Sequence, residues 1–420
     1  PLTGYNPILF PLLILIMIRR IPIQDTLSPT VANFCRQLLG LHQQNQKFRG
    51  EVDTRYSSRI SQSTDNSVYQ AIPQAIIFPK SAQDIELLTW LASKPEFMSL
   101  KFSPRGGGTG TNGQSLTDHI IVDLSRHMRE ILEINVEEKW VRVQTGVIKD
   151  QLNDFLRPYG FFFAPDLSTS NRATIGGMIS TDASGQGSLV YGKTSDHVLG
   201  LTAVTIDGHV INTETEAVAE AEQKSKQDSK IGEIYRQVLS SCKDNRDEIL
   251  SVFPRLNRFL TGYDLEHVFN SDLTEFDLGR VLTGSEGTLA FITDAKLNIT
   301  PIAKFKTLLT IKYDSFDSAL RNSPFLVEAN ATSVETVDSK VLNLAKQDVV
   351  WDSVSDLILD VPNKVMDGLN IVEFNDEDES SQQAKVSSLC QRLDQLIANQ
   401  EAGVIGYQFT NDLASINRIY

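Results

Sequence analysis

Five glycines within ten residues mark the segment of this chain best suited to chemistry, residues 104–113 (PRGGGTGTNG). Glycine leaves the backbone N–H groups unobstructed and adopts positive φ at little cost, so a run of glycines can aim several N–H groups at one anion. A phosphate is the expected ligand. A glycine-rich turn without a ligand is the alternative that the segment alone leaves open.

Two nucleotide-binding motifs can be compared with this run. Residues 108–113 fit G-x-G-x-x-G, which in nicotinamide dinucleotide sites follows a strand and opens a helix. Here the run leads instead to residues 120–124 (IIVDL), a β-branched stretch typical of a strand. The Gly-Lys-Ser/Thr ending of an ATP or GTP phosphate loop is also missing. Neither kind of site is favoured.

Two later segments are also rich in glycine and small polar residues. Residues 164–191 are nearly uncharged and rich in Ser, Thr, Gly, Asn and Asp, a composition that predicts a binding segment because a free loop of that length is uncommon. Residues 281–292 predict a strand, a glycine turn and a second strand.

Several charged residues near these segments are candidates for chemistry. Arg105 could neutralise a phosphate or pair with a carboxylate beside the run, and we favour the first role. Arg172 fits ligand contact and structural hydrogen bonding equally. For Glu286, bonding to backbone N–H groups is favoured over a general base. No metal-ligand spacing occurs among the histidines, whose expected roles are solvent-exposed or capping: His42, His119, His127, His197, His209 and His267.

Composition limits the class of protein. The length of 420 residues suggests about three domains, and 39 basic against 53 acidic residues give a net charge of −14, which disfavours binding to nucleic acid or an anionic membrane. Three distant cysteines predict neither a disulfide framework nor a metal site, and they fit a reducing cytoplasm. The apolar stretch 8–18 is shorter than the ~20 residues of a membrane span. We interpret residues 1–16 as upstream translation, with a peripheral membrane anchor as the alternative.

Hydrophobic periodicity predicts the elements that position these segments. Residues 131–135 with 140–144, and 199–206 with 209–212, read as hairpins, whereas 49–67 reads as irregular. From about residue 304 strands and helices alternate, with an acidic loop, 376–379, expected before a cap at Ser380. Helices are expected over 30–41, 82–92 after a cap at Ser81, 149–156 and 231–250; in the last part of the chain, elements are expected at 307–313, 316–322, 333–337, 369–374, 384–397 and 403–409.

Taken together, RGGGT at 105–109, IGGMISTDASG at 175–185 and GSEGTL at 284–289 resemble the FAD-linked oxidases of the vanillyl-alcohol oxidase (PCMH-type) family. The resemblance implies an α+β fold: an N-terminal extension (1–68), a two-part PCMH-type FAD-binding domain (69–304) and the start of an α+β substrate cap domain (305–420). It also implies the residues that bind FAD: Arg105, Gly106, Gly107, Gly108, Thr109, Gly110, Asn112, Asp166, Ser168, Thr169, Gly176, Gly177, Thr181, Ser184, Gly185, Glu286, Gly287 and Ile292.

The chain departs from the family pattern at two places. Members with covalently attached flavin carry histidine where this chain has Thr109, so the resemblance implies noncovalent FAD. The usual Thr-Asn-Ala-Gly-Gly is TDASG here, which leaves the contacts of Asp182 and Ser184 open.

More closely, residues 102–113, 167–174 and 257–263 look like the large bacterial D-2-hydroxyglutarate dehydrogenases, which join an FAD half to an iron-sulfur half. The resemblance implies oxidation of a D-2-hydroxy acid, first D-2-hydroxyglutarate, with D-lactate or glycolate as alternatives, and electron transfer to an acceptor. The catalytic base, a divalent metal and the cluster cysteines are expected beyond Tyr420, so no catalytic or metal residue is assigned. A truncated flavin-binding subunit without catalysis is the second interpretation, and a homo-oligomer is compatible with both.

Overall fold

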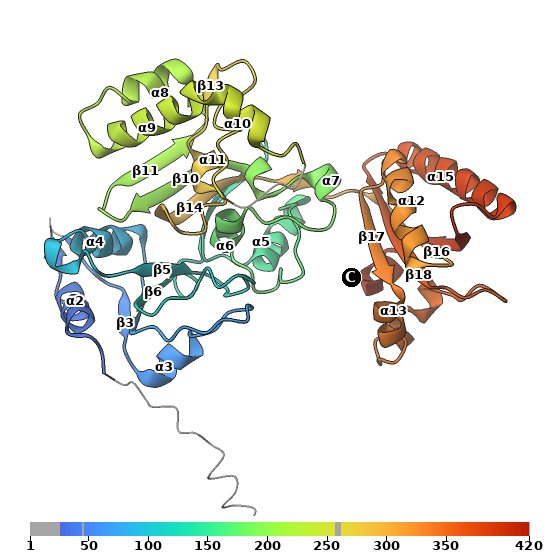
Figure 1. Ribbon diagram of the computed structural model, residues 1–420, viewed down its shortest axis with the longest axis horizontal. Coiled ribbons are helices and arrows are strands. Elements are labelled where there is room, and N and C mark those ends of the chain that lie inside the picture. The colour runs from blue at the N-terminus through green and yellow to red at the C-terminus, as the bar shows by residue number, and fades with distance from the viewer. Residues whose placement is uncertain (1–25, 44–45, 257–261, 420) are drawn as a thin grey trace, which may run out of the picture.

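The computed structural model of the chain describes residues 26–43, 46–256 and 262–419, arranged as two domains joined near residue 304 (Figure 1). A four-stranded and a five-stranded sheet build the first domain, and one four-stranded sheet builds the second. The predicted α+β class is confirmed. The expectations for residues 1–16 and for the apolar stretch 8–18 lie outside the described residues. Among the helices that are described, none is long and apolar enough to cross a membrane.

The first sheet has the order β3-β4-β6-β5, with one antiparallel and two parallel pairings. β4 and β6 are buried along their whole length, which suits central strands covered on both faces. α4 begins at the predicted cap, because the Ser81 side chain accepts a hydrogen bond from the Asp84 N–H. The elements are α2 (Pro29–Leu39), β3 (Glu51–Asp53), α3 (Tyr56–Ser61), β4 (Ala75–Phe78), α4 (Ala82–Ala92), β5 (Phe102–Arg105) and β6 (Ile120–Asp123).

The prediction of an irregular segment over 49–67 is wrong. β3 pairs with β4 at the edge of the first sheet, and α3 follows it. Three polar-flanked residues are too short for a periodic signal, which is why the sequence did not reveal the strand. Phe34 and Leu38 of α2 are fully buried in the core beneath the same sheet. We therefore propose that the first domain begins near residue 29 rather than near residue 69.

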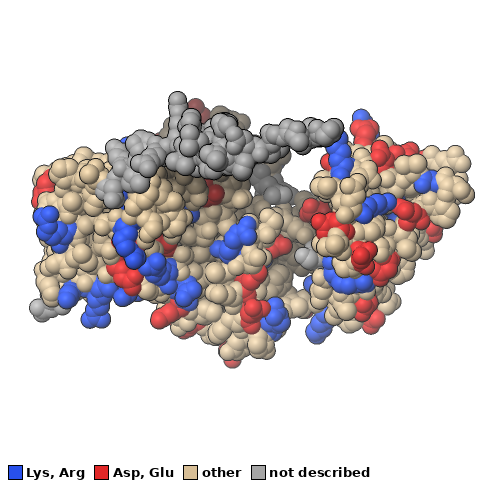
Figure 2. Space-filling view, turned by 90° about the horizontal axis from the view of Figure 1, so that it is seen from below, with Lys and Arg blue, Asp and Glu red and all other residues tan. Residues whose placement is uncertain are grey.

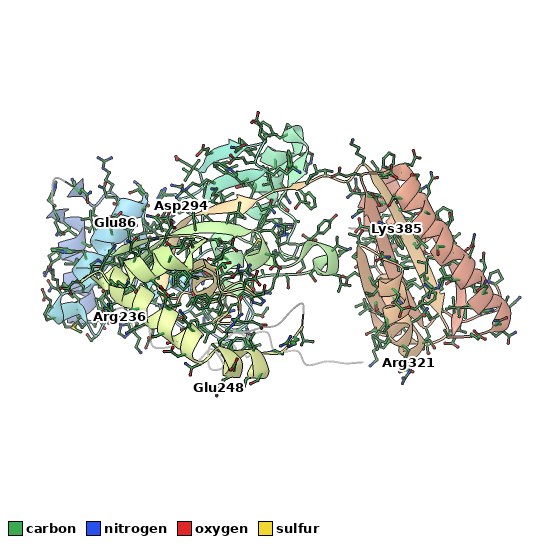
Figure 3. All side chains as sticks on the ribbon, turned by 90° about the horizontal axis from the view of Figure 1, so that it is seen from above. Glu86, Arg236, Glu248, Asp294, Arg321 and Lys385 are labelled. Carbon is green, nitrogen blue, oxygen red and sulfur yellow. The ribbon has the colours of Figure 1, made fainter. Side chains whose placement is uncertain are left out.

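The second sheet has the order β11-β10-β14-β8-β7, and all its pairings are antiparallel. Both predicted hairpins are confirmed. Val204 of β10 and Phe291 of β14 share a core cluster with Ile77 of the first sheet, so the two sheets pack as one domain. Asp294, labelled in Figure 3, lies on β14 and pairs with Arg142 at 2.7 Å. The sheet elements are β7 (Ile131–Asn135), β8 (Trp140–Gln144), β10 (Val198–Thr205), β11 (Val210–Glu214) and β14 (Ala290–Asn298).

Two helix layers pack on one face of the second sheet, because Ile211 in the core of the second layer pairs with Ala203 in the core of the first. Leu152 of α5 and Ile179 of α6 are fully buried against one face, and α8, α9 and α10 form a further layer with its own core. The helix expected over 231–250 is present as two consecutive helices that meet at Asn245. One expectation is wrong here, because a short helix, α11, replaces the first strand of 281–292. The elements are α5 (Lys149–Leu156), β9 (Phe161–Phe162), α6 (Ile175–Thr181), α7 (Ser188–Tyr191), β12 (Glu216–Ala217), α8 (Val218–Lys224), α9 (Lys230–Asp244), α10 (Arg246–Val252), β13 (Glu275–Phe276), α11 (Gly279–Leu282) and β15 (Thr300–Pro301).

The second domain is an antiparallel sheet of order β17-β18-β16-β19. α12 and α15 pack on this sheet, and Figure 3 labels Arg321 on the first helix and Lys385 on the second. α15 is capped by Asp378, not by the expected Ser380. The elements are β16 (Phe305–Tyr313), α12 (Phe316–Glu328), β17 (Ser333–Asp338), α13 (Ser339–Ala345), α14 (Trp351–Val354), β18 (Gly368–Asp376), α15 (Glu379–Asn399), β19 (Val404–Thr410) and α16 (Leu413–Ile419).

Charged side chains are mixed over both domains. On the face drawn in Figure 2, acidic and basic residues alternate without a large patch of one sign. Because the chain carries a net charge of −14, an anionic ligand needs local donors.

Candidate cofactor site

A cavity of about 470 Å³ lies between the two sheets of the first domain. Three segments line it: the glycine run that follows β5, residues of the second segment around α6, and residues 286–292 at the start of β14. The ends of β6 and β8 add Leu124 and Thr145. The three segments singled out in the sequence, far apart along the chain, therefore meet at one site.

Glycines allow the first two segments to lie in contact. A Cβ on Gly106 would overlap the Thr174 hydroxyl, and a Cβ on Gly107 would overlap the Arg172 carbonyl oxygen. At Gly176, a Cβ would come within 2.7 Å of Thr145 Cβ. Real Cβ atoms do not tolerate such distances, so these glycines are needed for the packing of the cavity wall.

The glycine run also presents unpaired donors. Residues 106–111 line the cavity, and within the described chain none of their N–H groups donates to a protein acceptor. The next N–H group, that of Asn112, donates to Gln114 Oε1 at 3.1 Å. Backbone N–H groups in folded proteins almost always have a partner. A row of free donors beside a cavity therefore fits an anion such as a pyrophosphate.

The second segment uses its N–H groups differently. The Gly176 N–H donates to the Thr145 carbonyl at 2.8 Å, and the Gly177 N–H donates to the Thr174 hydroxyl at 3.3 Å. Thr174 is thus the N-cap of α6. Gly176 and Gly177 shape the wall of the cavity, and free donors come from the first segment.

The third segment connects to both others through Glu286, which has a positive φ of 52°. Its carboxylate accepts a hydrogen bond from Gln114 Nε2 at 3.3 Å, and its N–H donates to the Ser180 carbonyl at 2.8 Å. The expected bonding to backbone N–H groups is therefore replaced by a bond to a side-chain amide. This arrangement gives Glu286 a structural role.

All the predicted site residues line this cavity except Asp166, Ser168 and Gly185. Asp166 instead forms an ion pair with the buried Lys149, and both line a second cavity of about 330 Å³ between the domains. Sequence reasoning missed lining residues with no glycine or charge to mark them, although the Thr before IGG signals the N-cap Thr174. These are Pro104, Thr111, Gln114, Ser115, Leu124, Thr145, Leu167, Ala173, Thr174, Met178, Ser180, Ala183 and Ala290.

The contacts of Asp182 can now be assigned. Its φ is 47°, a left-handed conformation that Asn and Asp tolerate better than most residues, and it ends α6. Its carboxylate is 2.6 Å from Lys193 Nζ and accepts a hydrogen bond from the Ser195 N–H at 2.7 Å. Asp182 therefore ends the helix at the position where the resemblance implies Asn, and it pairs with a lysine that is 6% exposed.

The histidines do not form a metal site. Among the described residues, no group of three or more His, Cys, Asp or Glu side chains could hold a metal ion. His197 is only 6% exposed but fits the capping alternative, because it is the C-cap of the 3-10 helix Thr194–Asp196; its Nε2 lies 2.6 Å from the Tyr191 carbonyl oxygen. The segment 257–263 used for the resemblance lies mostly outside the described residues.

The chain is similar in sequence to known flavin enzymes. It matches the FAD binding domain over residues 73–214 and the C-terminal domain of FAD linked oxidases over 302–420. A D-2-hydroxyglutarate dehydrogenase of Escherichia coli (strain K12) is 60% identical over 93% of this chain and 38% of that protein. The glycolate oxidase subunit GlcD of Bacillus subtilis (strain 168) is 28% identical over 65% of this chain and 47% of that protein.

A solved structure of alkyldihydroxyacetonephosphate synthase has a TM-score of 0.63 at 18% identity, covering 94% of this chain and 64% of that one. At this identity the likeness shows a shared fold. The chain spans less than two fifths of the length of the Escherichia coli relative.

Proposed function

We propose, from the premise that the chain belongs to the FAD-linked oxidases of the vanillyl-alcohol oxidase (PCMH-type) family, that its three-segment cavity holds FAD noncovalently for the oxidation of a D-2-hydroxy acid. The observation that carries the proposal is the row of unpaired N–H groups at residues 106–111 beside this cavity. These donors would face the pyrophosphate of the cofactor. Thr109, at the position where covalent members carry histidine, supports noncovalent attachment.

The residues around the cavity suit such a cofactor. The run supplies donors without a basic cluster, and apolar residues such as Leu167, Met178 and Ile292 cover the flanks and exclude water. Bound FAD supplies a hydride acceptor, and the protein orients it. The remaining predicted contacts of FAD, including those of Asp166, Ser168 and Gly185 outside the cavity, are part of the proposal.

We propose D-2-hydroxyglutarate as the first substrate, because the relative at 60% identity bears that name. Its oxidation to 2-oxoglutarate removes a hydride from C2 and a proton from the hydroxyl group. Glycolate and D-lactate are the competing substrates, since the glycolate oxidase subunit is a more distant relative at 28% identity. No residue of this chain is proposed as the base.

The further cofactors, the compartment, the partners and the oligomeric state of the enzyme are also proposals. Because the relatives are much longer, we assign the iron-sulfur cluster and the divalent metal to parts of them that this chain does not match. We propose a cytoplasmic enzyme with a separate electron acceptor, at most peripheral membrane contact, no nucleic-acid partner and a homo-oligomeric state. Three free cysteines and the net charge of −14 support the compartment and the lack of nucleic acid. A flavin-binding subunit without catalysis is the second candidate, since the chain matches only part of its relatives.

A substrate screen tests the proposal. The full-length protein is assayed with an artificial electron acceptor and D-2-hydroxyglutarate, D-lactate or glycolate, each at several concentrations. A kcat/KM highest for D-2-hydroxyglutarate is expected. A preference for either competitor would contradict the substrate, and flavin that no 2-hydroxy acid reduces would favour the flavin-binding subunit. The variant Gly108→Val, which should lose FAD, is the control for acceptor reduction without flavin.

A further inference from the structure

A short segment before the matched FAD-binding domain touches the glycine run at two places. This segment, residues 62–69, is called the arm. It follows α3 and is folded back on itself, because Thr64 bridges Gln70 in antiparallel fashion and the Ser63 carbonyl accepts a hydrogen bond from the Ala71 N–H at 3.0 Å. Ser63 is fully buried, so the arm is anchored in the first domain.

Arg105 links the arm to the start of the run. Its Nη2 donates to the Thr64 carbonyl at 2.7 Å, and its Nη1 donates to the Gln62 carbonyl and to the Ser115 hydroxyl, both at 3.3 Å. The Ser115 hydroxyl in turn donates to Asp65 Oδ2 at 3.2 Å. The guanidinium is therefore occupied by the arm and by Ser115, which lies just after the run.

The same guanidinium also lies against Gly108, in the middle of the run. Gly108 has a φ of 63°, and a Cβ there would come within 2.5 Å of Arg105 Nη2. Arg105 is 8% exposed, and its pKa is lowered by burial while Asp123 and Asp65 attract its charge. Two carboxylates of the protein thus offset part of the cost of burying this positive charge.

Tyr69 provides the second contact, at the other end of the run. Gly113 has a φ of 79°, and a Cβ there would lie 3.1 Å from Tyr69 Cδ2. The Gly113 carbonyl accepts a hydrogen bond from the Leu116 N–H at 3.0 Å, which closes the turn after the run. The arm therefore borders the left-handed Gly113 directly, and it reaches the left-handed Gly108 only through the guanidinium of Arg105.

We infer that the arm is part of the cofactor site: through Arg105 and Tyr69 it fixes the glycine run in the conformation that presents its N–H groups, and Arg105 is a positioning residue. This inference rests on the proposed function, because it concerns the same FAD cavity. It assigns to residues 62–69 a role in FAD binding, although they precede the matched domain at residue 73. It also replaces the direct phosphate contact expected of Arg105.

The first test uses variants of the arm that leave the core intact. Asp65→Ala and Tyr69→Ala are compared with Val68→Ala, a matched control because Val68 lies on the same arm and is 95% exposed. FAD is titrated into each apo-protein, with the melting temperature of the apo-protein measured in parallel. We expect the Kd for FAD to rise at least about fivefold for Asp65→Ala and Tyr69→Ala, the effect of losing one polar or packing contact, while Val68→Ala stays at the wild-type value.

Two results of this test would overturn the inference. One is an unchanged Kd for both arm variants in a wild-type chain that binds FAD. The other is a rise in Kd that occurs only together with a large fall in the apo-protein melting temperature, which would indicate general destabilisation. A wild-type chain that does not bind FAD at all would instead contradict the proposed function.

The second test separates positioning from phosphate binding. Lysine binds phosphate as a point charge but cannot bridge two carbonyls as the planar guanidinium does. We expect Arg105→Lys and Arg105→Gln to weaken FAD binding to the same extent. Affinity largely retained by Arg105→Lys and lost by Arg105→Gln would establish a charge contact and overturn the positioning role. If either Arg105 variant does not fold, the arm variants decide.

Discussion

Gly287 of the third segment packs directly on Pro104 at the start of the glycine run. Its φ is 77°, and a Cβ at Gly287 would overlap the Pro104 ring at Cγ. The two residues are far apart along the chain: Pro104 lies in β5 of the first sheet, and Gly287 lies in the turn that leads to β14 of the second. The first and third segments therefore meet only because both positions tolerate a close approach.

Substitution of Gly287 tests this junction. Gly287→Ala should weaken FAD binding at least about tenfold, because it adds both a positive-φ strain of about 1 kcal/mol and an overlap with Pro104. Gly160→Ala is the matched control: Gly160 has a φ of 80° and no atom within 4 Å of the added Cβ. The measurement is the Kd for FAD of both variants. An equal effect of the two substitutions would mean that strain alone matters.

The ion pair between Asp182 and Lys193 should stabilise the end of α6. Asp182→Asn keeps the left-handed conformation but leaves the charge of the buried Lys193 without this partner, and we expect a loss of about 2 kcal/mol in the free energy of unfolding. Adding Lys193→Met should recover part of that loss, because the buried positive charge is then removed. Urea unfolding of both variants measures this. A double variant less stable than Asp182→Asn would argue against the pairing.

Contacts between α7 and the second domain should affect turnover more than FAD binding. Tyr191 of α7 and Asn375 of β18 line the same cavity, the pKa of the Tyr191 hydroxyl is raised above its ordinary value chiefly by burial, and Gln186 Nε2 donates to the Ser333 hydroxyl at 3.3 Å. We expect Tyr191→Phe to lower kcat of the full-length protein about fivefold, the effect of losing one polar contact, with the Kd for FAD unchanged. Tyr159→Phe, at an exposed tyrosine, is the control. A change in Kd with an unchanged kcat would contradict the prediction.

Two buried thiols should make the fold sensitive to alkali. Burial raises the pKa of Cys35 and of Cys242 from 9.0 to about 11. In the unfolded chain these thiols ionise near pH 9, whereas in the folded chain they stay protonated up to about pH 11. Their contribution to stability is therefore complete below pH 9 and is lost as the pH rises toward 11.

Urea unfolding at pH 8 and pH 10.5 checks this expectation. The wild-type protein should lose about 2 kcal/mol per thiol over this range, and Cys242→Ala should lose less. Equal pH dependence in the two proteins would show that Cys242 does not titrate as expected.

Local patterns allowed much of the fold to be predicted. The helix after Ser81 and the hairpin over 131–144 are confirmed because caps and alternation act over a few residues. The strand β3 and the helix α11 were not predicted, because segments of three or four residues are too short to show a periodic pattern of apolar and polar side chains. Their structure depends on neighbours far away in the sequence.

In the candidate site, too, local patterns were predicted from the sequence, whereas contacts between distant residues were not. Glycine density identified the three segments, but the sequence did not indicate that Gly106 packs on Thr174 or that Arg105 reaches the carbonyls of residues 62 and 64. The role of Asp182 also required Lys193, a residue with no motif of its own. Contacts across the chain decide which residues of a motif bind and which residues position it.

The central claim is that the three-segment cavity holds FAD without a covalent bond, and acid precipitation of the purified protein tests it most directly. We expect folded protein to carry close to one flavin per chain, released into the supernatant as FAD when the protein is precipitated. Flavin that stays with the pellet would contradict the noncovalent attachment inferred from Thr109. Folded protein that neither carries flavin nor takes it up from added FAD would contradict the account of the cavity itself.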